Sequence, residues 1–388
     1  MNTLMKKKNE SSEQLNIQLF LLCMLAALLC RRLGKISSLR IICGMLRTMI
    51  YVGVYIGWGI SIYKRVIQKG AHPILRTSFE DFSNIFIKYA NNEQLEYIDP
   101  IIKLEYETVN KFISIGAPMN TKNMARADLS KLAKRSKASQ GLSKTLMDRT
   151  AKGEASWVIA DVPTHALAQE AKMSFDEYSE FLFKSCYLDL DNPVAKLREL
   201  DEKQTKWANY LNNVKKVRIV GEKTDITFGV EGRKWISCSG VNNYPDGEVF
   251  TSPVENDING EIYFDFPQNY RGNSATKVHL WIENGKIVKF DAATGKDYLE
   301  AMFNMDEGSK GIGEIAIGTN EEIQEVTGNI LFDEKIGGSI HMAVGASYPE
   351  TGGKNVSGLH WDMIKNMKNG GQIYADDKLI YENGKFII

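Results

Sequence analysis

The sequence has little cysteine, little histidine and no net charge. Its 388 residues include five cysteines without a C-x-x-C pair, which argues against a disulfide framework and for reduced thiols. Lysine plus arginine and aspartate plus glutamate number 48 each, so no net field favours nucleic acid, and a small or neutral substrate is expected. Because there are only five histidines, a metal site would depend mainly on carboxylates.

Common signatures of nucleotide binding and of serine hydrolases are absent as well. The sequence contains no G-x-x-x-x-G-K-[ST] loop and no G-x-G-x-x-G pattern between a strand and a helix, so nucleotide binding is not supported. It also contains no G-x-S-x-G elbow, which weakens the case for a serine hydrolase.

Residues 1–63 differ from the rest of the chain. Residues 19–30 form an unbroken apolar run and residues 49–63 a second uncharged run, and both are shorter than the roughly 20 residues of a membrane-spanning helix. Lysines at positions 6 to 8 precede the first run, as in a signal or anchor sequence, but no clear small-residue cleavage site follows. We expect a cytoplasmic protein. The alternatives are a membrane-associated form held by residues 19–63, or an N-terminal segment without native meaning.

Residues 64–213 predict an α/β domain with a mainly parallel sheet. Apolar spacing and β-rich runs predict helices over residues 78–89 and 194–212 and strands over residues 111–118 and 156–162. Ser174 and Glu177 form a capping box that begins a further helix. Strands that alternate with helices are typical of parallel sheets.

Residues 214–388 predict a mostly antiparallel β domain. Short strands are expected over residues 217–220, 225–230 and 262–266. Asn284-Gly285 and Asn383-Gly384 each predict the tip of a hairpin. The expected fold is therefore a two-domain α/β and α+β protein, whose second domain holds the candidate chemistry.

Acidic and imidazole side chains stand among glycines and apolar residues in four segments of this second domain. The segments are residues 245–253, 313–320, 332–345 and 357–362. A carboxylate in an apolar setting needs a cation, and a divalent metal ion is the obvious candidate. His360 and Asp362 would face the same side of an extended segment. Considered singly, each of these residues is more often a solvated surface group.

Considered together, these residues favour a metal hydrolase. His341 and His360 lie within twenty positions of each other in the sequence, in the same proposed domain as Glu248 and Glu314. A set of His, Asp and Glu without Cys suits zinc, cobalt or manganese. It also suits a hydrolase in which two ions polarise a carbonyl group and activate water.

Several long motifs resemble those of the aminopeptidase T family, which also includes AmpS-like two-metal aminopeptidases. In the β-rich part they are PDGEVFTSPVE, GEIAIGTN, FDEKIGGSIHMAVG, SYPETGGKNVSGLHWDMI and GGQIYADDKLIYENGKF. Earlier in the chain they are GAHPILRTSFE, YANNEQLEYIDP, SIGAPMNT and MSFDEYSEF. The resemblance covers roughly residues 64–388, in the same order as in the family, whereas residues 1–63 depart from it.

This resemblance implies a two-metal centre whose ligands are Glu248, Glu314, Glu334, His341, His360 and Asp362. It implies a metal-dependent aminopeptidase that cleaves the N-terminal peptide bond of short peptides with water activated by two divalent ions. Glu314 would carry the proton and Tyr348 would stabilise the oxyanion, while a metal or a spare carboxylate such as Glu248 would capture the α-amino group. A homodimer is implied as well. The alternatives are a membrane-tethered form of the enzyme, or an inactive or peptide-binding product caused by residues 1–63.

Overall fold

The computed structural model describes residues 58–388. The chain divides into two compact units, Met1–Ser78 and Phe79–Ile388, and residues 58–68 of the first are helical. The apolar run over residues 19–30 lies outside the described residues, as does most of the run over residues 49–63. Within the described part of the chain, no helix is long and apolar enough to cross a membrane.

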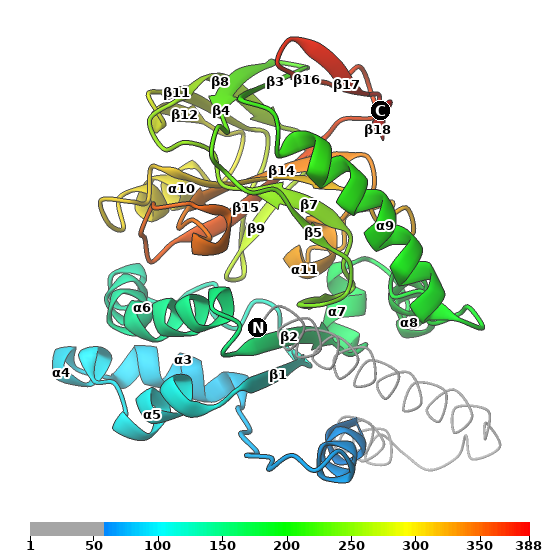
Figure 1. Ribbon diagram of the computed structural model, residues 1–388. Coiled ribbons are helices and arrows are strands. Elements are labelled where there is room, and N and C mark those ends of the chain that lie inside the picture. Colours follow the sequence, from blue (N-terminus) through cyan, green and yellow to red (C-terminus); the bar gives the residue numbers. More distant parts are fainter. Residues whose placement is uncertain (1–57) are drawn as a thin grey trace. The chain divides into compact units, whose positions relative to one another are not determined.

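Helices dominate the first part of the larger unit (Figure 1). They are α3 (Glu80–Tyr89), α4 (Asn92–Glu96), α5 (Pro100–Thr108), α6 (Leu129–Ala151), α7 (His165–Glu170), α8 (Phe175–Ser185) and α9 (Pro193–Leu211). The predicted capping box of α8 is confirmed, because Ser174 accepts from the Glu177 amide while the Glu177 side chain accepts from the Ser174 amide. The helix predicted over residues 78–89 is confirmed with a later start, and the helix predicted over residues 194–212 is confirmed one position earlier in the chain.

Helix α6 has no counterpart among the predicted elements. Its 23 residues are rich in lysine and serine, and Leu132 is its one fully buried residue, so its apolar periodicity is weak. The helix begins where the Asp128 side chain accepts hydrogen bonds from the amides of Ser130 and Lys131. Local capping and tertiary packing therefore define α6 better than its apolar pattern does.

A small parallel sheet connects the two parts of the larger unit. The predicted strands are confirmed as β1 (Lys111–Gly116) and β2 (Ser156–Asp161), which pair in parallel. The third strand, β6 (Asn243–Tyr244), comes from the β-rich part of the chain and pairs in parallel with β2. This pairing places the start of the segment that leads to Glu248 beside the α/β part.

An antiparallel sheet of eight strands forms one layer of the β-rich part. In sheet order the strands are β12 (Lys286–Asp291), β11 (Val278–Glu283), β8 (Ile258–Phe264), β4 (Thr224–Gly229), β3 (Lys216–Gly221), β16 (Gln372–Ala375), β17 (Lys378–Glu382) and β18 (Lys385–Phe386). Both predicted hairpins are confirmed, since Asn284-Gly285 joins β11 to β12 and Asn383-Gly384 joins β17 to β18. All four turn residues have positive φ, as this turn type requires.

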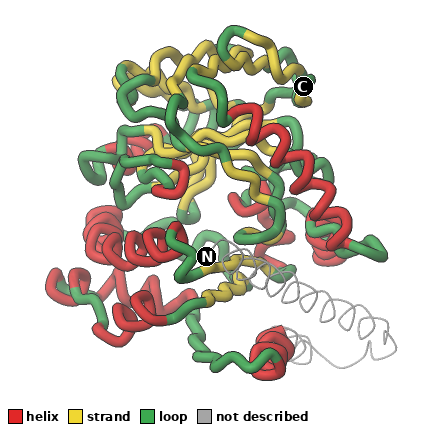
Figure 2. The backbone as a smooth tube through the Cα atoms, viewed as in Figure 1, coloured by secondary structure: helices red, strands yellow, loops and turns green. Residues whose placement is uncertain are grey.

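A five-stranded sheet forms the second layer. Its order is β15 (His360–Asn366), β14 (Ser339–Gly345), β13 (Ile312–Gly318), β7 (Glu248–Thr251) and β5 (Ile236–Cys238). Smaller elements complete the fold: β9 (Gln268–Tyr270), β10 (Asn273–Ala275), α10 (Lys296–Phe303), α11 (Ile330–Asp333) and the 3₁₀ turn η1 (Pro349–Thr351). Figure 2 shows most of the strands in this part of the chain and most of the helices before it.

The main hydrophobic core uses one face of the five-stranded sheet. Ile315 and Ile317 of β13 and Met342 of β14 belong to the same buried cluster as Ile219 and Phe228 of the eight-stranded sheet. Because side chains alternate along a strand, residues between these positions lie on the opposite face. The fold is thus mixed α/β, with a small parallel sheet and larger antiparallel sheets. The domain boundary near residue 214 stays a prediction.

Candidate metal centre

The residues expected as metal ligands occupy neighbouring strands and one loop. The positions are Glu248 on β7, Glu314 on β13, His341 on β14, His360 and Asp362 on β15, and Glu334 directly after α11. His360 is half-buried and Glu334 is partly buried, whereas the other four are buried. Residues separated by more than one hundred sequence positions therefore meet in one place.

Strand register places these side chains on one face of the sheet. Glu314 lies opposite Ala343, and Ala343 lies opposite Asp362, so the two carboxylates share one row across β13, β14 and β15. His341 is two residues before Ala343 and His360 two residues before Asp362, and alternate residues share a face. This face points away from the main core.

Small residues on that face leave room for the longer side chains. Ala316 pairs with His341, and Gly318 pairs with Glu248, so no bulky side chain stands between the candidate ligands of β7, β13 and β14. A side chain on Gly318 would also meet the backbone oxygen of Ile336 at 2.3 Å. The glycine is therefore required by close packing behind the loop that carries Glu334.

The two imidazoles point their Nε2 atoms at carboxylates. His341 Nε2 lies 3.3 Å from Glu248 Oε2, 3.7 Å from Glu314 Oε1 and 3.9 Å from Asp362 Oδ1. His360 Nε2 lies 3.3 Å from Glu314 Oε2 and 3.4 Å from Asp362 Oδ1. Glu314 is thus shared between the two histidines.

The other ring nitrogen of each histidine is held by the backbone. His341 Nδ1 lies 3.0 Å from the Glu334 carbonyl oxygen, and His360 Nδ1 lies 2.9 Å from that of Ala346. A carbonyl oxygen can only accept, so each Nδ1 carries a hydrogen and a neutral ring presents a bare Nε2 lone pair to the carboxylates. The Nε2 lone pairs and the carboxylate oxygens repel one another unless a proton or a metal cation lies between them. This donor arrangement fits metal ligation.

Unsatisfied oxygens support the same conclusion. Glu248 Oε2 and Asp362 Oδ1 are buried without a hydrogen-bond partner among the described residues. Ligand atoms close enough to share an ion form three overlapping groups: Glu248, Glu314 and His341; Glu314, His360 and Asp362; and Glu334, His341 and Asp362. All six expected ligands are therefore brought together by the fold, and they fit divalent metal ions in an oxygen-rich site.

The protonation equilibria show how strongly these groups are coupled. Burial raises the pKa of Glu248 to about 8, although the charges of Lys335 and His341 oppose the shift. Burial alone would lower the pKa of His341, but Glu314, Glu248 and Asp362 outweigh it and raise this pKa to about 9. The buried carboxylates thus create a strong demand for positive charge.

Lys335 supplies part of the positive charge that these carboxylates need. This residue was not singled out from the sequence. Its side chain is fully buried, and its Nζ lies 2.8 Å from Glu248 Oε1 and also contacts the Glu334 carboxylate. These carboxylates outweigh the effect of burial and raise the pKa of Lys335 well above its usual value. The available signal was its position directly after Asp333 and Glu334 in the motif FDEKIGGSIHMAVG.

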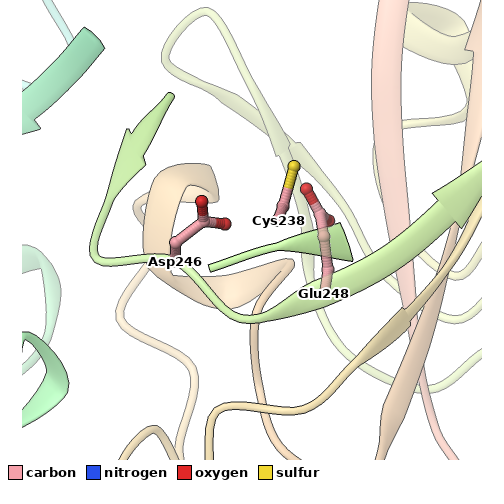
Figure 3. A group of neighbouring side chains, drawn as sticks. All are labelled: Cys238, Asp246 and Glu248. Atoms are coloured by element: carbon pink, nitrogen blue, oxygen red, sulfur yellow. The ribbon is translucent and has the colours of Figure 1, made fainter. Parts of the chain in front are cut away.

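Glu248 also belongs to a further group of potential ligands, together with Cys238 and Asp246 (Figure 3). Asp246 accepts hydrogen bonds of 2.9 Å from the amides of Gly240 and Gly247, so its carboxylate already braces the loop before β7. Burial raises the pKa of the Cys238 thiol, which disfavours the thiolate that metals bind. We therefore assign this group a structural role in positioning Glu248.

A pocket opens over the candidate ligands. Its other walls are formed by Trp157, Cys238, Asn242, Asn243, Phe250, Tyr348 and Glu350. Tyr348 packs edge-on against His360, with ring centroids 5.1 Å apart, so its phenol belongs to the same cavity. Trp157 comes from β2, so the α/β part contributes to this wall. Phe250 and Glu350 lie within motifs quoted above, but apart from Tyr348 none of these wall residues was assigned a role from the sequence.

Comparisons with known proteins agree with this site. The profile of the family described as "Thermophilic metalloprotease (M29)" matches residues 58–386. Aminopeptidase 2 of Geobacillus stearothermophilus is 31% identical over 264 residues, covering 61% of this chain and 62% of that protein. Aminopeptidase AmpS of Bacillus subtilis is 25% identical over 364 residues, covering 80% of this chain and 88% of that protein. The chain thus matches less than two thirds of the length of aminopeptidase 2.

The fold also has a counterpart among solved structures. Wild-type AmpT from Thermus thermophilus superposes with a TM-score of 0.72 at 19% identity, covering 86% of this chain and 91% of that chain. At this identity the similarity establishes the fold alone.

Proposed function

The chain belongs to the thermophilic metalloprotease family M29, and we propose that it is a metal-dependent aminopeptidase that hydrolyses the N-terminal peptide bond of short peptides. Its membership confirms the resemblance to the aminopeptidase T and AmpS proteins. The observation that carries the proposal is the meeting of four carboxylates and two imidazole Nε2 atoms at the floor of one pocket. Aminopeptidase 2 and AmpS are both named as aminopeptidases, and this supports a peptide with a free N-terminus as the substrate.

Two divalent ions, zinc, cobalt or manganese, would be held by the overlapping ligand groups. Glu314, which belongs to two of the groups, would be among the residues that hold the ions, and Glu334 would add an oxygen beside His341 and Asp362. When bound, the ions supply Lewis acidity for the scissile carbonyl group and for the attacking water.

The protein's own side chains would move the proton and stabilise charge. Glu314, at the centre of the site, would accept the proton of the attacking water at a carboxylate oxygen and return it to the leaving amine. Burial raises the pKa of Tyr348 well above its usual value, and the nearby Glu314 carboxylate adds to the shift. The phenol therefore stays protonated at neutral pH and can donate a hydrogen bond to the oxygen that becomes negative.

The test is metal reconstitution of the purified full chain with a panel of aminoacyl-p-nitroanilides. We expect release of p-nitroaniline with zinc, cobalt or manganese, loss of activity with a chelator, and no cleavage of N-acetylated substrates. The Glu314→Gln variant should be inactive with every ion, while exposed Glu283→Gln on β11 serves as the matched control. Activity that persists in the chelator, or no activity with any ion, contradicts the proposal.

A homodimer is part of the same proposal. Light scattering after size-exclusion chromatography measures the mass directly, and a mass equal to one chain would exclude the dimer.

A further inference from the structure

One carboxylate in the pocket wall has neither a hydrogen bond nor a close ion pair within residues 58–388. Glu350 lies in η1 and lines the same pocket as Glu314, Tyr348 and His360. It is half-buried, and within residues 58–388 its side chain makes neither a hydrogen bond nor an ion pair, although the charge of Lys234 acts on it from farther away. A charge withdrawn from water without a partner is unfavourable, so a ligand that supplies the partner gains binding energy.

The other carboxylates of the pocket are already engaged. Glu248 and Glu334 contact Lys335, and Glu314 and Asp362 face His360. None of the described residues that line the pocket is a lysine or an arginine. A cationic group that enters the pocket would therefore find its free counter-charge at Glu350 rather than at Glu248, which the sequence analysis had considered for this role.

The backbone around Glu350 is held firmly in place. The Thr351 hydroxyl oxygen is buried and lies 2.7 Å from both the Tyr348 carbonyl oxygen and Ser252 Oγ. The Thr351 carbonyl oxygen accepts a hydrogen bond of 2.9 Å from the Lys234 amide. The carboxylate is thus presented from a fixed turn, which limits the ordering cost when a ligand binds.

We propose that Glu350 binds the α-ammonium group of the N-terminal residue of the substrate. This inference rests on the proposed aminopeptidase function and names the group that would restrict it to free N-termini. In a peptide, one carbon atom separates the ammonium nitrogen from the first carbonyl carbon. An ammonium held at Glu350 therefore keeps the first peptide bond in the pocket that contains Glu314 and Tyr348. The side chain of that residue would meet the wall formed by Trp157 and Phe250.

The experiment compares binding of a ligand with and without the amine. Leucinol carries the ammonium group and cannot be hydrolysed, and 4-methylpentan-1-ol has the same skeleton without it. Titration calorimetry on the metal-loaded chain should show that Glu350→Gln weakens leucinol binding about 10- to 100-fold, the value of a charge-assisted hydrogen bond. Binding of 4-methylpentan-1-ol should be unchanged, and Glu283→Gln should behave as wild type with both ligands.

Several outcomes would overturn the inference. Glu350→Gln could bind leucinol as wild type does, or it could lose both ligands equally, which indicates a structural effect. A parallel assay with leucyl-p-nitroanilide separates this inference from the function. If wild type cleaves the substrate and Glu350→Gln keeps its KM, the ammonium role fails and the peptidase stands. If wild type cleaves nothing, the function fails while the calorimetry still measures amine recognition.

Discussion

Replacing Lys335 by methionine should destabilise the metal-free protein strongly. The substitution keeps the approximate length of the side chain but removes a fully buried charge that contacts Glu248 and Glu334. Breaking a buried ion pair by removing one partner costs about 3–5 kcal/mol, because the remaining charge stays buried. Domains are stable by only about 5–15 kcal/mol, so the loss is a large fraction of the total. It corresponds to a decrease of the thermal midpoint on the order of 5–15 °C.

Divalent ions should restore much of this loss. The two freed carboxylates belong to the candidate ligand groups, so a bound cation can replace the missing positive charge. Thermal unfolding, followed by circular dichroism with chelator and with added zinc or manganese, measures both quantities. We expect the midpoint of Lys335→Met to rise more on metal addition than that of wild type.

Lys365 provides the matched control. It is equally buried, but its Nζ lies 3.3 Å from the backbone carbonyl oxygen of Glu222 and makes no close ion pair among the described residues, since the carboxylates of Asp265 and Glu222 act on it only from farther away. Lys365→Met should therefore change stability little and show the metal response of wild type. If both variants lose equal stability, or if metal restores nothing in Lys335→Met, Lys335 does not balance the charge of this centre.

Three other predictions follow from the same structure. Tyr348→Phe should lower kcat about 100- to 1,000-fold with little change in KM, measured by steady-state kinetics, because it removes one oxyanion donor without emptying the pocket. Gly247→Ala should destabilise the protein by about 1–3 kcal/mol in urea unfolding, because Gly247 has φ of +139° and a side chain there would meet Asn320 Cβ at 2.7 Å. Burial lowers the pKa of Lys365, so its charge costs stability at neutral pH. Any gain from Lys365→Met should therefore shrink as the pH rises through that lowered pKa, and it should vanish above 10.5, where the wild-type amine is neutral in both the folded and the unfolded state; urea unfolding across this pH range measures it.

Local features of the fold could be predicted from the sequence because their causes are local. The capping box of Ser174 and Glu177 and the Asn-Gly turns at residues 284 and 383 depend on a few adjacent residues. Helix α6 and the origin of β6 could not be predicted in this way. The first lacks a strong apolar stripe, and the second pairs with a strand that lies more than eighty residues earlier.

The residues of the candidate site also fall into those that the sequence indicated and those that it did not. Glu248, Glu314, His341, His360 and Asp362 stood out in the sequence because charged and imidazole groups among apolar residues need a reason to be there. Lys335 and Glu350 did not stand out, although one is the main cation at the site and the other is the unpaired carboxylate in the wall.

The sequence by itself therefore determined the family, the local helices and hairpins, and the residue types available for catalysis. Only the tertiary structure decided which of those charges are neutralised. Burial and pairing depend on the register of β7, β13, β14 and β15 and on the turn η1 between β14 and β15. These elements are far apart in sequence, and their contacts exist only once the sheet has formed. In the described part of the chain, Lys335 therefore has two carboxylates in contact, whereas Glu350 has no ion-pair contact.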